Sequence, residues 1–239
     1  MRIDKLLSNM GYGSRKEVRQ LLKNGAVRVN EELIKKPNVH IDTEDDVVTC
    51  FGEQVIYQQY IYLMMNKRQG VLSATEDVVG ATVLDDLTEE DRHFKPFPVG
   101  RLDKDTEGFL LLSNDGKMAH NLLSPKKDVP KTYYAHIEGR VTEEDIEAMA
   151  KGVILEDGTK TKPGKLVILT SGAQSEIELT ITEGKFHQVK RMFQAVGKEV
   201  VYLKRLSMGP LQLDERLPLG AYRPLTEEEM ALLVPYLED

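Results

Sequence analysis

The order of apolar and polar residues predicts a small, mainly helical unit at the start of the chain. The apolar residues of 1–10 have helical spacing, and Ser14 with Glu17 three positions later forms a capping-box pattern that predicts a second helix. Short alternating strands are expected at 27–29 and 45–49. This unit therefore combines two helices with a small sheet.

The rest of the chain alternates predicted strands with predicted helices. The unbroken apolar run Phe109–Leu112 reads as a strand buried on both faces, and turn residues follow it. Further strands are expected at 60–65, 71–73, 133–138, 166–169 and 175–182, with helices near 117–123, 142–151 and 186–196. This series predicts an α+β fold with a mixed, mainly antiparallel central sheet and flanking helices. The change of pattern near residues 55–60 predicts two domains, 1–58 and 59–239.

Charge is segregated along the chain, although the net charge of the 239 residues is −7. Residues 1–36 hold nine basic and four acidic side chains, whereas residues 37–60 hold five acidic side chains and no lysine or arginine. Arg15, Arg19 and Lys23 recur every four residues and form a basic stripe along the second predicted helix. Such a stripe is either a solvated helix face or a surface for nucleic acid.

Composition also bears on the compartment. The single cysteine, Cys50, cannot form an internal disulfide, which fits a reducing environment. The charged N-terminus lacks the pattern of a secretory signal, and no apolar stretch approaches the roughly 18–20 residues needed to cross a bilayer. We therefore expect a cytoplasmic protein with no membrane partner.

The stretch GRLDKDTEGFLLLSNDG, residues 100–116, places two carboxylates at the entrance of the strongest predicted strand. Loops held by a rigid scaffold commonly carry active groups. Asp103 and Asp105 could nevertheless make only turn hydrogen bonds, form the carboxylate pair of a glycosidase, or bind a metal ion. No histidines or cysteines cluster with metal-ligand spacing, so no metal is expected. The two carboxylates alone leave the other readings open.

The opening stretch RIDKLLSNMGYGSRKEVRQLLKNGAVRVN resembles the S4 RNA-binding domain over about residues 1–50. The resemblance implies that the helix pair and the following turn grip RNA phosphates, with Arg15, Arg19 and Lys23 as contacts. On its own it predicts RNA binding and no chemistry.

Four further stretches resemble the pseudouridine synthases, in the branch that modifies ribosomal RNA at single sites. They are PVGRLDKDTEGFLLLSNDG, KTYYAHIEG, EGKFHQVKRMF and LKRLSMGPLQL, in the family's order along the chain. The form HQVKRM is similar to the small-subunit group, which implies 16S ribosomal RNA as the target, with large-subunit RNA as the alternative. Lys67-Arg68 departs from the lysine-proline that relatives often have, and we expect this change to loosen a turn.

The resemblance implies an isomerase that detaches uracil from ribose, turns it and reattaches it through carbon. No cofactor is implied, and the sequence has no P-loop or GxGxxG pattern. Asp103 matches the family's catalytic aspartate, Lys190 its basic partner, and Tyr133 the tyrosine on which a flipped uracil stacks. The carboxylate could attack the sugar, attack the base or assist proton removal. Covalent catalysis at the sugar with elimination is the favoured interpretation.

Other residues are expected to bind the RNA or to shape the pocket. Arg101 is expected to hold the loop or the RNA backbone, and Arg191 to face phosphate. Lys131 flanks the stacking tyrosine, and Leu203 lines either the pocket or the core. The expected partner is ribosomal RNA, free or in an assembling particle, and the enzyme is expected to be a monomer. A non-catalytic S4-type RNA-binding protein is the alternative from another class.

Overall fold

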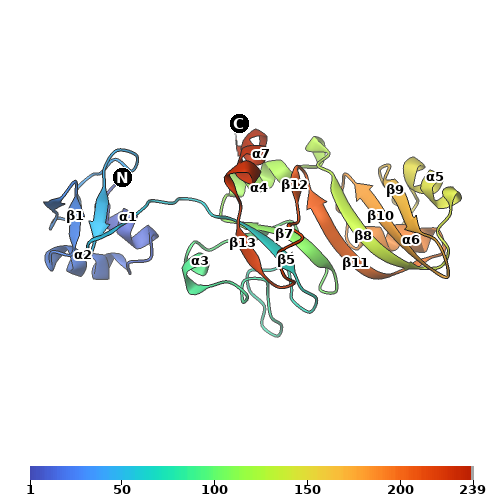
Figure 1. Cartoon of the computed structure of the whole chain (residues 1–239), viewed down its shortest axis with the longest axis horizontal. Helices are drawn as coiled ribbons and strands as arrows, with labels where there is room; N and C mark the ends of the chain where they lie inside the picture. Colours follow the sequence, from blue (N-terminus) through green and yellow to red (C-terminus); the bar gives the residue numbers. More distant parts are fainter. Residues whose placement is uncertain (238–239) are drawn as a thin grey trace. The chain divides into compact units, whose positions relative to one another are not determined.

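The computed structural model describes residues 1–237 and divides the chain into two compact units (Figure 1). The first unit holds residues 1–61 and 88–95, and the second holds residues 62–87 and the chain from Pro96 onward. The predicted second domain ran to Asp239, so its last two residues lie outside the described range. Among the described residues, no helix is both long and apolar enough to span a membrane.

The first unit packs two of its three helices and a four-stranded sheet around its own apolar core. Its elements are α1 (Ile3–Asn9), α2 (Arg15–Lys23), β1 (Val27–Val29), β2 (Glu32–Leu33), β3 (Val48–Cys50), β4 (Glu53–Gln54) and α3 (Glu89–His93). The strand order is β2-β1-β3-β4. Asn30 and Glu31 both have positive φ angles, of 48° and 69°, which suit the tight β1–β2 turn. His93 Nε2 lies 3.1 Å from the carbonyl oxygens of Ser8 and Asn9, so α3 is fastened to the end of α1.

The capping box predicted at the start of α2 is confirmed. The Ser14 amide donates to Glu17 Oε2 at 2.7 Å, and the Glu17 amide donates to Ser14 Oγ at 3.4 Å. Val18 and Leu22, on the inner face of this helix, are fully buried. Its basic side chains therefore remain on the outer face.

The second unit is built on a nine-stranded sheet with the main order β13-β5-β7-β11-β8-β10-β9. Its strands are β5 (Tyr62–Lys67), β6 (Phe97–Val99), β7 (Glu107–Ser113), β8 (Lys131–Glu138), β9 (Lys165–Thr170), β10 (Gln174–Ile181), β11 (Glu199–Met208), β12 (Leu211–Gln212) and β13 (Tyr222–Pro224). Among the described strands, only β7 and β11 pair in parallel. The predicted α+β fold with a mixed, mainly antiparallel sheet is confirmed.

Helices cover this sheet in two groups. The helices are α4 (Gly116–Leu123), the 3₁₀ turn η1 (Pro125–Lys127), α5 (Glu143–Lys151), α6 (Gln188–Ala195) and α7 (Glu227–Leu237). Figure 1 shows α4 and α7 side by side at one end of the sheet, and α5 and α6 at the other. Met118 and Leu122 of α4, Leu233 of α7 and Phe109 of β7 share one apolar core. The second group packs against β9 and β11.

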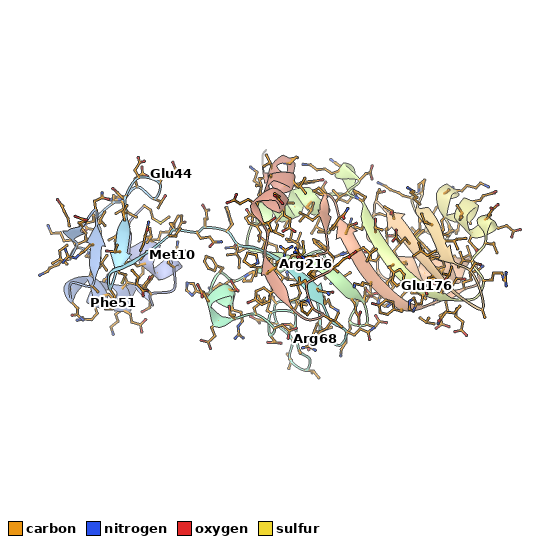
Figure 2. All side chains as sticks on the ribbon, viewed as in Figure 1. Met10, Glu44, Phe51, Arg68, Glu176 and Arg216 are labelled. Atoms are coloured by element: carbon orange, nitrogen blue, oxygen red, sulfur yellow. The ribbon has the colours of Figure 1, made fainter. Side chains whose placement is uncertain are left out.

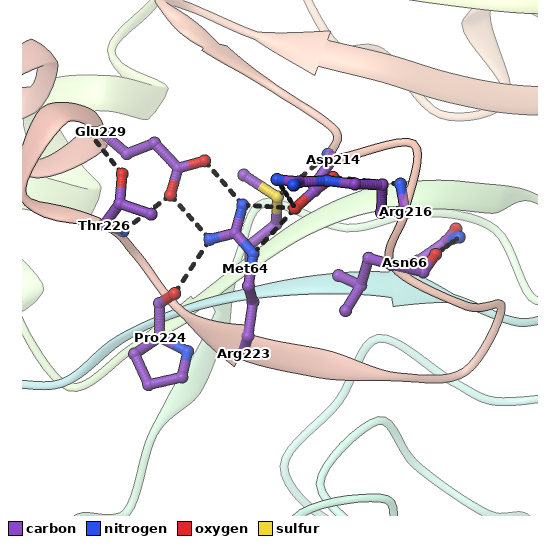
Figure 3. Close-up of polar contacts among 9 residues, drawn as sticks. Met64, Asn66, Asp214, Arg216, Arg223, Pro224, Thr226 and Glu229 are labelled. Carbon is purple, nitrogen blue, oxygen red and sulfur yellow. Dashed lines mark hydrogen bonds and ion pairs between the residues drawn. The ribbon is translucent and has the colours of Figure 1, made fainter.

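The C-terminal helix α7 is held by a network of ion pairs around Arg223 (Figure 3). The Arg223 guanidinium donates to Glu229 at 2.8 Å and to Asp214 at 3.1 Å. Glu229 also accepts from the Thr226 amide at 2.8 Å, and this pair caps the start of the helix. The sequence pattern did not predict this helix.

The segment after β5 differs from its prediction. Residues 71–73 do not form a strand, and Leu72 makes only an isolated parallel bridge with Thr82. The Arg68 side chain, labelled in Figure 2, forms two hydrogen bonds with Asp86, at 3.0 and 3.2 Å. The arginine that replaces the expected proline therefore ties the turn to the following loop and does not leave it loose.

Candidate active site

The loop that carries both predicted carboxylates precedes β7 and is fixed from below by a buried lysine. Lys67, at the end of β5, is fully buried. Its ammonium donates to the carbonyl oxygens of Thr106 at 2.8 Å and Asp103 at 3.0 Å, and to that of Arg68 at 3.1 Å. Burial lowers the pKa of Lys67 to about 8, although nearby carboxylates oppose that shift. The backbone around Asp103 is thus held by a cation that the sequence reasoning did not assign to the site.

The predicted pair of Asp103 and Lys190 meets in the structure. Lys190 Nζ, on the first turn of α6, lies 3.0 Å from Asp103 Oδ2 and 2.7 Å from Asp105 Oδ1. His187 Nε2 lies 3.6 Å from the other carboxylate oxygen of Asp103. One lysine therefore joins two carboxylates whose chain positions lie 85 or more residues away.

The ion pairs change the proton affinities of this cluster. Burial alone raises the pKa of Asp105, but the hydrogen bond and charge of Lys190 outweigh it and hold the pKa below its ordinary value. Burial alone lowers the pKa of Lys190, but hydrogen bonds to Asp105 and Asp103 reverse this and raise it. The cluster is therefore stable as a charged lysine between carboxylates.

Strand register places Tyr133 on the same face of the sheet as this loop. Lys67 is paired with Gly108, Gly108 with Arg205, and Arg205 with Tyr133. Directly paired residues project from one face of a sheet. These four residues therefore lie side by side on one face, across β5, β7, β11 and β8, and the Asp103 loop lies on that face because Lys67 reaches its backbone. Gly108 is required because an added Cβ would lie 2.2 Å from the Arg205 carbonyl oxygen. The missing side chain lets β7 and β11 approach closely beneath the site.

The two predicted pocket residues on this face are nearly buried. Tyr133 is 8% exposed, and Leu203 is 5% exposed two positions before Arg205 on β11. Tyr134 points to the opposite face, as its neighbouring position predicts, and donates to Glu176 at 2.6 Å. Glu176 is labelled on β10 in Figure 2.

Arg205 is a second cation near the site that sequence reasoning did not select. It is 2% exposed, and its Nε donates to the Phe109 carbonyl oxygen at 2.9 Å. Its buried Nη2 has no hydrogen-bond partner among residues 1–237. Lys131 donates to the Val129 carbonyl oxygen at 3.1 Å, and burial together with the charge of Arg205 lowers its pKa. The LKRL motif could have drawn attention to Arg205, but no sequence signal shows that its charge is buried.

The remaining predicted RNA contacts differ in surroundings. Arg101 is exposed on the loop before Asp103. The Arg191 guanidinium instead contacts Glu156 at 3.0 Å and Asp157 at 2.5 Å. In the first unit, the predicted stripe on α2 is exposed at all three positions, namely Arg15, Arg19 and Lys23.

No group of three or more histidine, cysteine or carboxylate side chains that could hold a metal ion occurs in the described part of the chain. An open hollow of about 500 Å³ lies at the far end of α6, lined by Glu138, Gln194, Gly197, Lys198 and Glu199. It contains none of the predicted site residues. The chemistry-bearing groups gather instead around Asp103.

Comparisons with known proteins fit this arrangement. The family model described as RNA pseudouridylate synthase matches residues 61–195, and the S4 domain model matches residues 1–47. Together they define an RNA-modifying enzyme with an attached RNA-binding domain.

The chain is 59% identical to a protein named as an uncharacterized RNA pseudouridine synthase of Bacillus subtilis, over 98% of both chains. It is 39% identical to the ribosomal small subunit pseudouridine synthase A of Vibrio vulnificus, covering 96% of this chain and 98% of that one. It is 37% identical to the ribosomal large subunit pseudouridine synthase B of Bacillus subtilis, covering 97% and 95%.

A solved structure titled as a pseudouridylate synthase superposes with a TM-score of 0.69 at 36% identity, covering 98% of this chain and all of that one. The chain therefore belongs to the RNA pseudouridylate synthase family and is an isomerase that acts on RNA. The predicted family, fold class and enzyme class are confirmed. The family matches count against both the glycosidase reading and the non-catalytic binding protein.

Proposed function

We propose that this enzyme converts a uridine of small-subunit ribosomal RNA into pseudouridine, with Asp103 as the working carboxylate. The observation that carries the proposal is the 3.0 Å contact between Lys190 Nζ and Asp103 Oδ2. A cation at this distance attracts the carboxylate and fixes its orientation through a charge-assisted hydrogen bond. Lys67 adds positional control, because it holds the backbone carbonyl of the same residue.

The reaction is balanced without any external reactant. A carboxylate oxygen of Asp103 bonds to C1′ as the bond from C1′ to N1 breaks, and the electron pair of the broken bond leaves with the uracil. The base turns, and C5 bonds to C1′ as the bond between C1′ and Asp103 breaks and its electron pair returns to the carboxylate. The hydrogen on C5 then departs as a proton, and N1 gains one. The product is an isomer of the substrate.

The face beside the Asp103 loop is suited to hold a flipped base. A uridine within folded RNA is unreachable until it leaves the stack. Tyr133 offers an aromatic surface for that base, worth about 1–3 kcal/mol for a stacked base in other RNA-binding proteins. Leu203, on the neighbouring strand and the same face, closes the apolar side of the pocket.

The small-subunit target rests on the form HQVKRM at residues 187–192. The relatives named for the small and the large subunit have similar identities, so large-subunit RNA is the second candidate. Domain 1–58 binds the RNA, with Arg15, Arg19 and Lys23 on phosphates. In the second domain, Arg101 and Lys131 lie beside the pocket, and Arg191, paired with Glu156 and Asp157, positions the start of α6. Asp103, Tyr133 and Lys190 belong to one chain, which favours a monomer working in the cytoplasm where ribosomal RNA is assembled.

The test is tritium release from small-subunit ribosomal RNA labelled at uracil C5. Wild type and Asp103→Asn are compared under single-turnover conditions, on free RNA and on partly assembled particles. Wild type should release tritium, and Asp103→Asn should release none while binding RNA with nearly unchanged affinity.

Asp105→Asn is the matched control, because it lies on the same loop and shares Lys190. It should retain most of the activity, since Lys190 keeps its contact with Asp103. If Asp103→Asn releases as much tritium as wild type, Asp103 is not the catalytic carboxylate. Release only from large-subunit RNA would move the target to the second candidate.

A further inference from the structure

The aromatic side chains of Phe186 and His187 stack on each other next to the Asp103 carboxylate. The Phe186 side chain is 74% exposed. Its ring stacks on that of His187 with centroids 3.7 Å apart and planes 18° from parallel. His187 Nε2 lies 3.6 Å from Asp103 Oδ1. The imidazole ring of His187 therefore lies between the Asp103 carboxylate and the exposed phenyl ring of Phe186.

The backbone before this pair is braced from inside the unit. Gln188 is 4% exposed, and its side chain accepts from the Lys185 amide at 2.8 Å and donates to Glu183 at 2.7 Å. Lys185 and Glu183 also form an ion pair. These contacts fix the turn that leads into α6.

Arg191 braces the pair itself. Its Nη1 donates to the Phe186 carbonyl oxygen at 3.3 Å, and its amide donates to the His187 carbonyl oxygen at 2.9 Å. Glu156 and Asp157 hold the rest of the guanidinium. His187 has a φ of 50°, in the left-handed region that is uncommon for a residue other than glycine. The strained backbone is stabilised by its surroundings, as is common at functional sites.

An exposed phenylalanine in a braced segment needs an explanation other than folding. A ring that contacts water contributes little to the core, and a fixed position lowers the entropy lost on binding. The reacting ribose must come within about 3–3.5 Å of the Asp103 carboxylate. A ribose at that distance from Asp103 also comes close to His187, whose Nε2 lies 3.6 Å from the same carboxylate.

We propose that Phe186, backed by His187, stacks on the nucleobase next to the flipped uridine and keeps the RNA open, an inference that rests on the proposed function. Flipping leaves a neighbouring base without its partner in the stack. An apolar ring that covers this base stabilises the opened RNA, as apolar side chains do where they enter between base steps. The occupant of this surface is therefore an RNA base of any sequence.

The first test uses fluorescence and needs no turnover. The chain contains no tryptophan, so Phe186→Trp introduces a single indole at this surface. Leu169→Trp is the control, on β9, 48% exposed and four strands from β7 in the sheet order. Small-subunit ribosomal RNA is titrated into both variants, and its binding is followed separately by retention of labelled RNA on filters.

Stacking on a base quenches indole fluorescence, so the Phe186→Trp signal should fall as RNA binds, and the Leu169→Trp signal should stay constant. Bound RNA that leaves both signals unchanged, or quenches both equally, would overturn the proposal. If RNA quenches Phe186→Trp but wild type releases no tritium, the contact between position 186 and a base is supported and the proposed function is wrong.

The second test measures the single-turnover rate of tritium release. Phe186→Ala should lower the rate by about 5- to 150-fold, the range expected from base–aromatic stacking. Phe186→Trp should stay within about threefold of wild type, because a larger ring still stacks. Phe186→Leu should resemble Phe186→Ala. A leucine variant with wild-type activity would instead indicate that apolar contact suffices, and the stacking role would be wrong. Because the side chain is exposed, all three variants should melt at the wild-type temperature.

Discussion

Two helices of this enzyme, α2 and α6, carry basic side chains in different surroundings. On α2, the side chains of Arg15, Arg19 and Lys23 are exposed, and no carboxylate pairs with them within residues 1–237. At the start of α6, Lys190 contacts two aspartates and Arg191 contacts two further carboxylates.

The difference separates two uses of positive charge. Unpaired exposed cations attract the phosphate backbone at little structural cost, and their effect is strongly screened by salt. Cations that are already paired contribute little net field at a distance, but they fix the positions of their partners. The helix α2 is therefore suited to RNA affinity, and the start of α6 to geometry around Asp103.

The largest effect expected from this comparison belongs to Lys190→Met. Without the ammonium, Asp103 and Asp105 lose the cation that joins them, and we expect activity to fall about 100-fold. RNA affinity should be nearly unchanged. The lysine also holds the pKa of Asp105 down, so its removal should raise the pH at which the Asp105 carboxylate takes up a proton.

Single-turnover rates at neutral pH, with RNA binding measured separately, test this prediction. Lys190→Arg is the matched variant, because it keeps the charge, and it should retain more activity than the methionine variant. A methionine variant that loses RNA affinity but keeps its rate would show that Lys190 serves phosphate and not the carboxylates.

The second prediction concerns α2, where removal of charge should weaken RNA binding and leave the reaction rate unchanged. The triple variant Arg15→Gln, Arg19→Gln, Lys23→Gln should bind ribosomal RNA more weakly, and the slope of log affinity against log salt should become about two to three units shallower. The rate at saturating RNA should be nearly that of wild type. Titrations at several salt concentrations measure the slope, and an unchanged slope would mean that the stripe is only a solvated helix face.

The sequence was sufficient for the parts of this architecture that depend on local signals. The capping box at Ser14 and Glu17 starts α2, and the apolar run Phe109–Leu112 lies within β7. Both signals depend on neighbours in the chain, so periodicity and capping chemistry suffice to predict them. The meeting of Asp103 with Lys190 followed from the family resemblance, since nothing in the spacing of these residues predicts it.

Other parts depend on contacts between distant segments. The helix α7 was missed although Thr226 and Glu229 form a capping-box pattern and glutamates fill its first turn. Arg223 and Asp214 hold the start of this helix from outside it, which no local pattern shows. Arg191 was expected to face phosphate, but its carboxylate partners, Glu156 and Asp157, lie 35 and 34 residues earlier in the chain. Pairing of this kind is set by tertiary structure and leaves no local pattern.

Lys67 represents a third use of charge and gives the smallest predicted effect. It is fully buried, whereas the paired cations of α6 are only partly buried, and it donates to backbone carbonyls rather than to carboxylates. Carbonyl dipoles offset less of the desolvation cost than an anion does, which is consistent with a pKa lowered to about 8. The Asp103 loop therefore depends on a cation that titrates near neutral pH.

Wild-type activity should accordingly fall about fourfold between pH 7 and pH 8.5, the loss of protonated lysine expected for a pKa of about 8. The contribution of Lys67 to folding stability should change with pH in the opposite direction. Between pH 8 and the ordinary lysine value the unfolded chain binds more protons than the folded one, so this group makes folding more favourable as pH rises. Activity should therefore fall reversibly while the contribution of Lys67 to the melting temperature rises. Paired measurements of rate and melting across this range check both signs. An activity loss that accompanies unfolding would show that the loop does not depend on the charge of Lys67.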